Sequence, residues 1–295
     1  MNHAEWLIVD WGTTNFRAFA IDENGEVLSK LEKPMGLLQV NNGDFSGALE
    51  SVLKNWLENY QELPVYMAGM VGSAQGWVPV PYEKTPVKLV DIANKSTRFT
   101  LSWGAEAVIV PGIYDQSNCN NYDVMRGEEV QLLGLQNIIL KDEFIAVLPG
   151  THSKHVMVKE KKVETFKTYM TGEFFSILSK YSIIGMGLPA QENSSSSFLK
   201  GVLSDRSGEL LNTVFSARTL RIFEKIKETE VLDYLSGLLI GHELSHFKNE
   251  TVYIVGNTFL SEKYRLACDS LGLKYELVNG DLAFLEGMKQ VREML

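Results

Sequence analysis

Short apolar runs alternate with longer amphipathic stretches along the 295 residues of the chain. Apolar runs between glycines or charges are typical of buried strands, and apolar residues spaced by three and four predict helices that bury one face. The predicted strands are 6–9, 16–21, 65–68, 107–110, 144–148, 155–158, 251–255 and 275–278. The predicted helices are 45–60, 124–138, 172–180, 207–227, 230–247, 261–271 and 281–295, with Asp44 as the N-cap of the first. This alternation indicates mixed α/β architecture.

The connecting segments are rich in glycine and polar residues. Residues 69–81 predict a glycine-rich loop, and the serine run 194–197 predicts a solvated loop.

Size, charge and cysteine content narrow the class of protein. A length of 295 residues favours two domains, and 45% hydrophobic with 22% charged residues is ordinary for a globular protein with a full core. A formal net charge of -9 argues against nucleic acid as the main partner, because phosphate backbones need a basic surface, but small anionic ligands remain compatible with it.

The first residues do not resemble a signal peptide, and no apolar run approaches the ~20 residues of a membrane span, so a cytoplasmic protein without a membrane partner is expected. Cys119 and Cys268 match no metal-ligand spacing and are expected to be free thiols.

One segment of the chain occurs twice in similar form. VDWGTTNFRAF, residues 9–19, is similar to VLPGTHSKHVM, residues 147–157, and each predicts a strand, a Gly-Thr turn and a second strand. A glycine in a turn lets backbone N–H groups approach an anion, and threonine and serine hydroxyls add further donors. One copy alone would be interpreted as an ordinary hairpin, whereas two matching copies favour two lobes that each carry a phosphate-binding turn. The turn residues are Gly12, Thr13, Thr14 and Asn15 in the first copy and Gly150, Thr151, His152 and Ser153 in the second.

Asp10 ends the first apolar strand, directly before the first turn. A carboxylate in this position is costly unless it meets a cation or hydrogen-bond donors. Beside a phosphate-binding turn it is placed to hold Mg²⁺ through water, and the alternative is an aspartate that caps the turn. Further along, a predicted strand ends at Gly256-Asn257 and a helix follows, which predicts a nucleotide-sized crevice at the end of that strand.

The order of these elements resembles the superfamily of actin, sugar kinases and heat-shock-chaperone ATPases. Its members contain a first phosphate hairpin, a connecting helix, a second phosphate hairpin, a second connecting helix and an adenosine motif, which would be residues 8–19, 124–135, 146–158, 234–244 and 252–259. The resemblance covers nearly the whole chain and implies a two-lobed actin-like (ribonuclease H-like) ATPase fold of the α/β class with a central cleft. The lobes are expected at 1–140 and 141–280, with the C-terminal helix 281–295 packing back on the first.

Several strings within this frame look like the 2-keto-3-deoxygalactonate kinase (2-dehydro-3-deoxygalactonokinase) family. They are VDWGTTNFRAF, GMVGSAQGW, DVMRGEEVQLLG, LPGTHSKHV, MTGE and LSGLLIGHEL. The resemblance implies transfer of the γ-phosphoryl group of ATP to the terminal hydroxyl of 2-keto-3-deoxygalactonate in galactonate catabolism, with ATP and Mg²⁺ as cofactors. A kinase for another sugar or sugar acid and a non-metabolic actin-like ATPase switch are the alternatives. The sequence leaves the oligomeric state open, with a homodimer as one option.

Two adjacent acids, Glu128 and Glu129, lie near the start of the predicted helix 124–138. The helix dipole by itself favours acids in a first turn. In the superfamily, the acid that opens the first connecting helix faces the cleft, and Glu128 matches that position better than Glu129. The resemblance therefore implies that Glu128 accepts the proton of the attacking hydroxyl, with Asp10 as the rival base and Glu129 among the residues that bind substrate.

Cations and polar loop residues complete the candidate substrate site. Arg17, Arg126 and Lys154 could anchor a carboxylate or phosphate, although each could also be a surface charge and Arg126 could pair with the neighbouring glutamates. The loop of residues 69–81 could hydrogen-bond sugar hydroxyls and offer an aromatic wall, or it could be a structural surface loop. Its candidate residues are Gly72, Ser73, Gln75 and Trp77.

The string HELSH, residues 242–246, matches the H-E-x-x-H pattern of zinc proteases. That pattern fixes only three residues, and no convincing third-ligand motif follows it. Gly237 and Gly241 just upstream instead suggest close helix packing, as expected in a connecting helix.

Overall fold

The computed structural model describes residues 3–116, 121–204 and 209–295 and consists of two compact units. Unit 1 comprises Met1–Glu143, Val158–Thr165 and Asp281–Leu295, and unit 2 comprises Phe144–Met157 and Phe166–Gly280. Helices alternate with strands throughout, so the mixed α/β prediction is confirmed. Within the described ranges, no helix has both the length and the apolar character that crossing a membrane would require.

The main sheet of unit 1 has the strand order β3-β2-β1-β4-β8-β7. Three consecutive strands pair antiparallel, and β4 and β8 then lie parallel to β1. The central strand β1 is buried almost throughout because it has paired neighbours on both sides and an almost entirely apolar sequence. The strands are β1 (Trp6–Trp11), β2 (Phe16–Ile21), β3 (Val27–Lys33), β4 (Val65–Ala68), β7 (Thr97–Thr100) and β8 (Glu106–Ile109).

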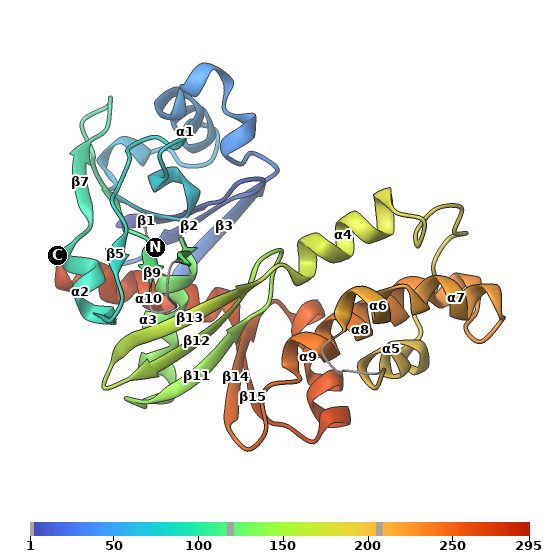
Figure 1. Ribbon diagram of the computed structural model, residues 1–295. Helices are drawn as coiled ribbons and strands as arrows, with labels where there is room; N and C mark the ends of the chain where they lie inside the picture. Colours follow the sequence, from blue (N-terminus) through green and yellow to red (C-terminus); the bar gives the residue numbers. More distant parts are fainter. Residues whose placement is uncertain (1–2, 117–120, 205–208) are drawn as a thin grey trace. The chain divides into compact units, whose positions relative to one another are not determined.

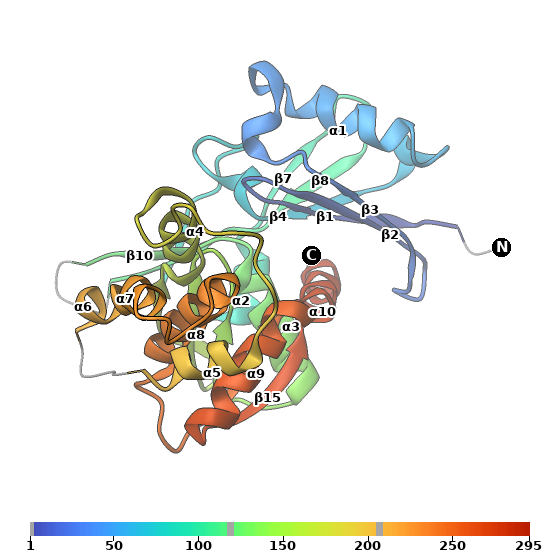
Figure 2. The ribbon, with the colours of Figure 1, turned by 90° about the vertical axis from the view of Figure 1, so that its right-hand side faces the viewer.

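Helices cover both faces of this sheet: α1 (Phe45–Lys54) lies over one face, and α3 (Glu128–Ile139) and α10 (Gly280–Met294) lie on the other (Figures 1 and 2). Helices α3 and α10 touch backbone to backbone. A Cβ atom at Gly134 of α3 would lie 1.9 Å from the Ala283 carbonyl oxygen, and one at Gly287 of α10 would lie 2.0 Å from the Val130 carbonyl oxygen. Only glycine permits this approach, so the C-terminal helix is held tightly against α3.

Smaller elements complete unit 1. A short sheet has the order β10-β9-β5, and Lys162 and Val163 at the start of β13 pair with β6. These elements are β5 (Glu83–Lys84), β6 (Val87–Lys88), β9 (Ile113–Asp115), β10 (Asp123–Met125), α2 (Leu89–Asn94) and the 3₁₀ turns Leu37–Gln39, Asn41–Gly43, Tyr60–Glu62 and Met70–Gly72.

The sheet that runs through unit 2 has the order β13-β12-β11-β14-β15. Its strands are β11 (Phe144–Leu148), β12 (Ser153–Lys159), β13 (Lys162–Tyr169), β14 (Thr251–Gly256) and β15 (Lys274–Asn279). Strands β14 and β15 follow parallel to β11, as β4 and β8 do to β1 in unit 1. In each unit, three strands that follow one another in the chain lie side by side, and two further strands extend the sheet parallel to the first of the three. This is the ribonuclease H-like arrangement, and it occurs twice. The predicted fold class is therefore confirmed.

Helices α5 (Ser195–Val202), α8 (Val231–Leu244) and α9 (Thr258–Leu271) share one apolar core with β11 and β14. Gly237 and Gly241 of α8 make the close helix contact that the sequence suggested. Their Cβ atoms would lie 1.9 Å from the Phe198 carbonyl oxygen and 2.6 Å from the Val202 carbonyl oxygen of α5. The other helical elements of unit 2 are α4 (Thr171–Tyr181), α6 (Leu210–Val214), α7 (Ser216–Ile222) and the 3₁₀ turn Glu228–Glu230.

Several local predictions differ from the structure. The helix predicted for 45–60 begins after its Asp44 cap but ends at Lys54, and the helix predicted for 124–138 begins only at Glu128, because the preceding residues form β10. The helix predicted for 207–227 is represented by α6 and α7, with its first residues outside the described ranges.

The serine run 194–197 is not a solvated loop. Ser194 is the N-cap of α5 and accepts a hydrogen bond from the Ser197 backbone N–H, and Ser197 is buried. Cys268 is a buried free thiol, as predicted, and burial raises its pKa to about 12. Cys119 lies outside the described residues.

Candidate active site

The first glycine turn joins β1 to β2 and lines an open pocket of unit 1. The Gly12 backbone N–H donates to the Asn15 carbonyl oxygen at 2.9 Å, which closes the turn. A Cβ atom at Gly12 would meet nothing nearer than 3.5 Å, so the fold itself has room for a side chain there. Glycine instead keeps the backbone open to a ligand. The pocket has a volume of about 570 Å³ and is lined by Asp10, Gly12, Thr13, Thr14, Asn15, Phe16, Arg17, Glu32, Lys33 and Pro34.

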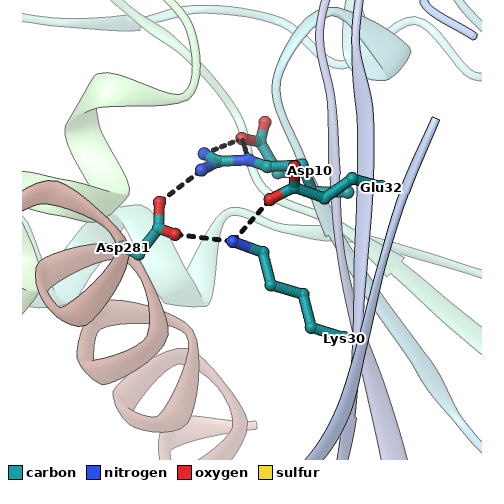
Figure 3. Close-up of polar contacts among 5 residues, drawn as sticks. Asp10, Lys30, Glu32 and Asp281 are labelled. Atoms are coloured by element: carbon teal, nitrogen blue, oxygen red, sulfur yellow. Dashed lines mark hydrogen bonds and ion pairs between the residues drawn. The ribbon is translucent and has the colours of Figure 1, made fainter. Parts of the chain in front are cut away.

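Charged side chains form a connected network beside this turn (Figure 3). Arg17 Nε donates to Asp10 Oδ2 at 3.1 Å, and Arg17 Nη1 donates to Asp281 at the start of α10. Lys30 continues the network to the second oxygen of Asp281, at 2.8 Å, and to Glu32. Burial by itself would raise the pKa of Asp281, but Lys30 and Arg17 hold it below its ordinary value. Arg17, predicted to bind substrate, is thus engaged by two carboxylates in this structure.

Two glycines bring the carboxyl end of β4 close to Asp10 and to the start of α3. Gly69 has φ +94°, and a Cβ atom there would lie 2.8 Å from the Trp11 carbonyl oxygen and 3.2 Å from Asp10 Oδ1. Gly127, the residue before α3, has φ +110° and packs on Gly69, with its Cβ position 3.5 Å from the Gly69 Cα atom. Side chains at these positions would be strained, so the two glycines let three chain segments converge at one place.

Arg126 lies at this junction as a buried cation with spare donors. Its side chain is 9% exposed, its Nη2 donates to the Val80 carbonyl oxygen at 2.8 Å, and its guanidinium carbon lies 4.1 Å from the centre of the Tyr82 ring. Among the residues that the structure describes, its Nε and Nη1 atoms are buried without a hydrogen-bond partner, and so is the hydroxyl of Ser73. Nη1 lies 2.9 Å from the Cβ position of Gly72, so the glycine makes room for the guanidinium. Buried unpaired donors are costly, and an anionic ligand could satisfy those of the guanidinium.

Glu128 and Glu129 occupy the first turn of α3 in different environments. Glu128 is half-buried and accepts the Arg126 backbone N–H at 3.1 Å. Glu129 is fully buried and accepts the Gly127 backbone N–H at 2.7 Å. Burial, with a further contribution from the negative charge of Glu128, raises the pKa of Glu129 to about 8. At neutral pH Glu129 therefore holds its proton.

The other loop candidates differ in their surroundings. Gln75 is exposed. The Trp77 ring packs on the rings of Trp11, Phe45 and Phe99, at centroid distances of 6.4, 6.4 and 5.3 Å. Trp77 therefore anchors the loop in the core of unit 1, and its role as an aromatic wall for a sugar stays a prediction.

The second glycine turn, between β11 and β12, belongs to unit 2. A Cβ atom at Gly150 would meet nothing nearer than 4.0 Å, so this turn also keeps an open backbone. The first turn of α4 packs directly on it. The Glu173 backbone N–H donates to the Thr151 carbonyl oxygen at 3.0 Å, and the Glu173 carboxylate lies 2.5 Å from His152 Nε2.

Two candidates of this hairpin have their side chains turned to protein partners. The Ser153 hydroxyl donates to Glu243 at 2.7 Å, and Lys154 is 5% exposed with its ammonium donating to Thr168 at 2.8 Å. Their phosphate- and substrate-binding roles stay predictions.

The turn at Gly256-Asn257 connects β14 to α9. The Asn257 side chain caps α9 by accepting the Leu260 backbone N–H at 2.9 Å. The Ser261 hydroxyl is buried and has no hydrogen-bond partner in the described ranges, and it lies 3.1 Å from the Cβ position of Gly256. Ser261 was not predicted as a site residue, although its place one turn into the helix after this motif could have indicated it.

The HELSH string does not form a two-histidine helix face. Helix α8 ends at Leu244, so His246 lies beyond it, and Glu243 points into the core with 2% exposure. In the parts of the chain that the structure describes, no cluster of three or more His, Cys, Asp or Glu side chains is suited to hold a metal ion.

Two ribonuclease H-like units, each with an open glycine turn after its first strand, define a protein of the actin-like ATPase and sugar-kinase class. The chain belongs to the 2-keto-3-deoxy-galactonokinase family, whose model matches residues 10–291. It is 33% identical over 294 residues to the 2-dehydro-3-deoxygalactonokinase of Escherichia coli K12, with 98% of this chain and 97% of that protein covered. The family predicted from the motifs is therefore confirmed.

Solved structures agree with this assignment. A crystal structure from Sinorhizobium meliloti, described as a "putative 2-dehydro-3-deoxygalactonokinase protein", superposes with a TM-score of 0.89 at 31% identity over 98% of both chains. Component A of (R)-2-hydroxyglutaryl-CoA dehydratase from Acidaminococcus fermentans has a TM-score of 0.50 at 12% identity over 98% of both chains. At that identity the second likeness concerns the fold alone.

Proposed function

We propose that this protein transfers the γ-phosphoryl group of ATP to the terminal hydroxyl of 2-keto-3-deoxygalactonate and releases the 6-phosphate and ADP. Membership of the 2-keto-3-deoxy-galactonokinase family carries the proposal. The reaction requires ATP and so belongs in the cytoplasm, where ATP is supplied.

Arg126 and Ser73 are the proposed anchor of the substrate carboxylate. Within the described parts of the chain, Arg126 retains two buried N–H donors without partners and Ser73 retains a buried hydroxyl without one. Gly72, the residue before Ser73, carries no side chain that would fill the space beside Arg126 Nη1. A guanidinium binds a carboxylate through two parallel hydrogen bonds, and this binding is strong where water is excluded. A sugar acid satisfies these donors, whereas a neutral sugar would leave a buried cation unpaired.

Glu128 is the proposed general base. A base must be ionised at the working pH, and the raised pKa of Glu129 keeps that residue protonated near neutrality. Glu128 is half-buried beside Arg126, so a substrate held by its carboxylate would lie near this acid. Phosphoryl transfer asks little covalent chemistry of a protein, so correct positioning of the hydroxyl is the larger contribution.

The glycine turns at Gly12 and Gly150 are proposed to bind the phosphates of ATP, and Gly256 with Asn257 the adenosine. The backbone at Gly12 and Gly150 is open where a Cβ atom would fit, which suits close approach by phosphate oxygens. Arg17 donates to Oδ2 of Asp10, and Oδ1 accepts no hydrogen bond from the residues that the structure describes. Hard oxygen donors of this kind fit Mg²⁺, which in kinases is held by one or two carboxylates, phosphate oxygens and water. When bound, Mg²⁺ neutralises phosphate charge.

The test is an ADP-release assay of the purified protein with a panel of acceptors. The panel contains 2-keto-3-deoxygalactonate, its C4 epimer 2-keto-3-deoxygluconate, and neutral hexoses. We expect ADP release that depends on the first acid, with phosphorus NMR locating the new phosphate ester on its terminal carbon. ADP release without an acceptor would support an ATPase switch instead, and preference for another acceptor would support a different sugar kinase.

A further inference from the structure

Glu243 is a buried carboxylate that the reaction chemistry above does not use. It lies in the last turn of α8 with 2% exposure, and its two oxygens accept four hydrogen bonds. Oε1 accepts from the Ser153 hydroxyl at 2.7 Å and from His155 Nε2 at 2.8 Å. Oε2 accepts from the Thr171 hydroxyl and from the Tyr264 hydroxyl, the latter at 2.7 Å. A carboxylate with four donors is fully satisfied in the interior.

The four donors belong to three elements of unit 2. Ser153 and His155 are in β12, directly after the glycine turn at Gly150. Thr171 opens α4, and Tyr264 lies in α9, the helix that follows Gly256-Asn257. One side chain therefore joins the proposed phosphate turn to the helix of the proposed adenosine motif.

His155 contacts His246 as well as Glu243. His155 Nδ1 lies 3.4 Å from His246 Nε2, and His246 Nδ1 lies 3.0 Å from the Glu243 carbonyl oxygen, which can only accept. Burial by itself would raise the pKa of Glu243, but the bonds and charge of His155 hold it below its ordinary value.

The tip of the turn is also fixed against α4. A Cβ atom at Gly172 would lie 2.5 Å from the Gly150 carbonyl oxygen and 2.7 Å from the Thr151 Cα atom. The first turn of α4 therefore packs on the glycine turn without a gap, and Thr171 at its start is held by Glu243. A shift of Glu243 would move both the base of the hairpin and the helix that supports its tip.

The equivalent position of the first hairpin has a similar arrangement. Arg17, which matches His155 in the sequence repeat, is a cation bound to a carboxylate on a helix, Asp281 of α10. In both units the second strand of the hairpin is thus joined to a helix by a basic side chain and a carboxylate.

We propose that Glu243 is the positioning residue for the nucleotide phosphates: it holds the turn of residues 150–153 in the conformation that binds ATP and couples that turn to α9. The inference rests on the proposed use of ATP. Glu243 itself need not touch the nucleotide, and it acts through Ser153, His155, Thr171 and Tyr264.

The test compares Glu243→Gln with Glu230→Gln. Glu230 is the same residue type and is the N-cap at the other end of α8, about 20 Å away along the helix. It also accepts side-chain hydrogen bonds, from Ser197 at 2.6 Å and from Lys227 at 2.9 Å. The measurement is the Kd of the non-hydrolysable analogue AMPPNP with Mg²⁺ by calorimetry, together with thermal melting of each variant. We expect Glu243→Gln to weaken AMPPNP binding about 10-fold or more, because the NH2 group of the new glutamine cannot accept the hydrogen bonds that a carboxylate oxygen accepts. Glu230→Gln should leave the Kd unchanged.

If Glu243→Gln folds and its Kd for AMPPNP is unchanged, the proposal is overturned. An equal rise in the Kd of Glu230→Gln would also overturn it, because it would indicate a general loss of stability. If Glu243→Gln does not fold, Tyr264→Phe replaces it, because it removes one donor and keeps the carboxylate. Its expected rise in Kd is about threefold, and no rise would overturn the proposal. AMPPNP binding is measured without a sugar. If the wild-type protein binds AMPPNP but does not phosphorylate the sugar acid, the proposed substrate is refuted and this test remains valid.

Discussion

Replacement of Arg126 by methionine separates a binding role from a structural one. Arg126 is a buried residue, 9% exposed, and two nitrogens of its guanidinium have no hydrogen-bond partner among the described residues. Methionine keeps most of the side-chain volume and removes the guanidinium. A buried cation with unpaired donors costs stability, so Arg126→Met should melt at the wild-type temperature or above it. The variant loses one hydrogen bond, to the Val80 carbonyl oxygen, and the contact with the Tyr82 ring, which offset part of that gain.

The effect on substrate binding should be large and opposite. Each hydrogen bond between charged groups contributes roughly 1.5–3 kcal/mol, so loss of two bonds to a substrate carboxylate should cost about 3 kcal/mol or more. That corresponds to a rise of about 100-fold or more in the KM for the sugar acid. The KM for ATP should stay near the wild-type value, because the proposed ATP-binding turns lie elsewhere in the chain.

The assay is ADP release at varied concentrations of sugar acid, with Arg98→Met as the matched control. Arg98 belongs to the same unit, but its side chain is 48% exposed and pairs with Glu106 at 3.4 Å, so its replacement should change neither KM. A fall in melting temperature with an unchanged KM for the acid would refute the reasoning and make Arg126 a structural residue. An equal loss of affinity for a neutral sugar would also refute it, since that sugar has no carboxylate to lose.

Three further predictions concern the carboxylates of unit 1. Glu128→Gln should lower kcat about 10²–10⁴-fold with little change in the KM for the sugar acid, and a large loss in Glu129→Gln with none in Glu128→Gln would make Glu129 the base. Asp10→Asn should raise the Mg²⁺ concentration needed for half-maximal activity with circular dichroism unchanged, and full activity at limiting Mg²⁺ would exclude the metal role. The pKa of Glu129 is raised from 4.5 to about 8 in the folded state, so the unfolded chain releases this proton first. The free energy of unfolding should therefore fall between about pH 4.5 and 8, by on the order of 5 kcal/mol. Thermal melts of Glu129→Gln across that range should show a smaller fall than wild type, and parallel curves would contradict the raised pKa.

Local patterns in the sequence were sufficient for the family and the fold class. The two Gly-Thr turns, their flanking apolar strands and the connecting helices depend on residues that are neighbours in the chain, because turn geometry and strand burial are set over a few positions. Gly237 and Gly241 indicated a close helix contact because glycine in a helix usually has a packing reason. The largely exposed strand β3 and the half-buried strand β13 were not predicted, since lysines and glutamates interrupt their apolar residues as they would in a solvated loop.

The roles of individual charged residues depended on tertiary structure. Glu128 and Glu129 are adjacent and identical in type, and only the burial of one of them separates their charges. Arg126 shows spare donors only once Val80 and Tyr82 are placed around it, and Arg17 meets Asp281, 264 residues later, only through the fold.

Glu243 is the clearest case. In the sequence it belonged to a string that resembles a zinc site, and in the structure it joins four donors from three other elements. The sequence by itself determined which turns and helices form, because those choices are local. Tertiary structure alone decided which carboxylates are buried, charged or paired, because desolvation and Coulomb interactions depend on neighbours that are distant along the chain.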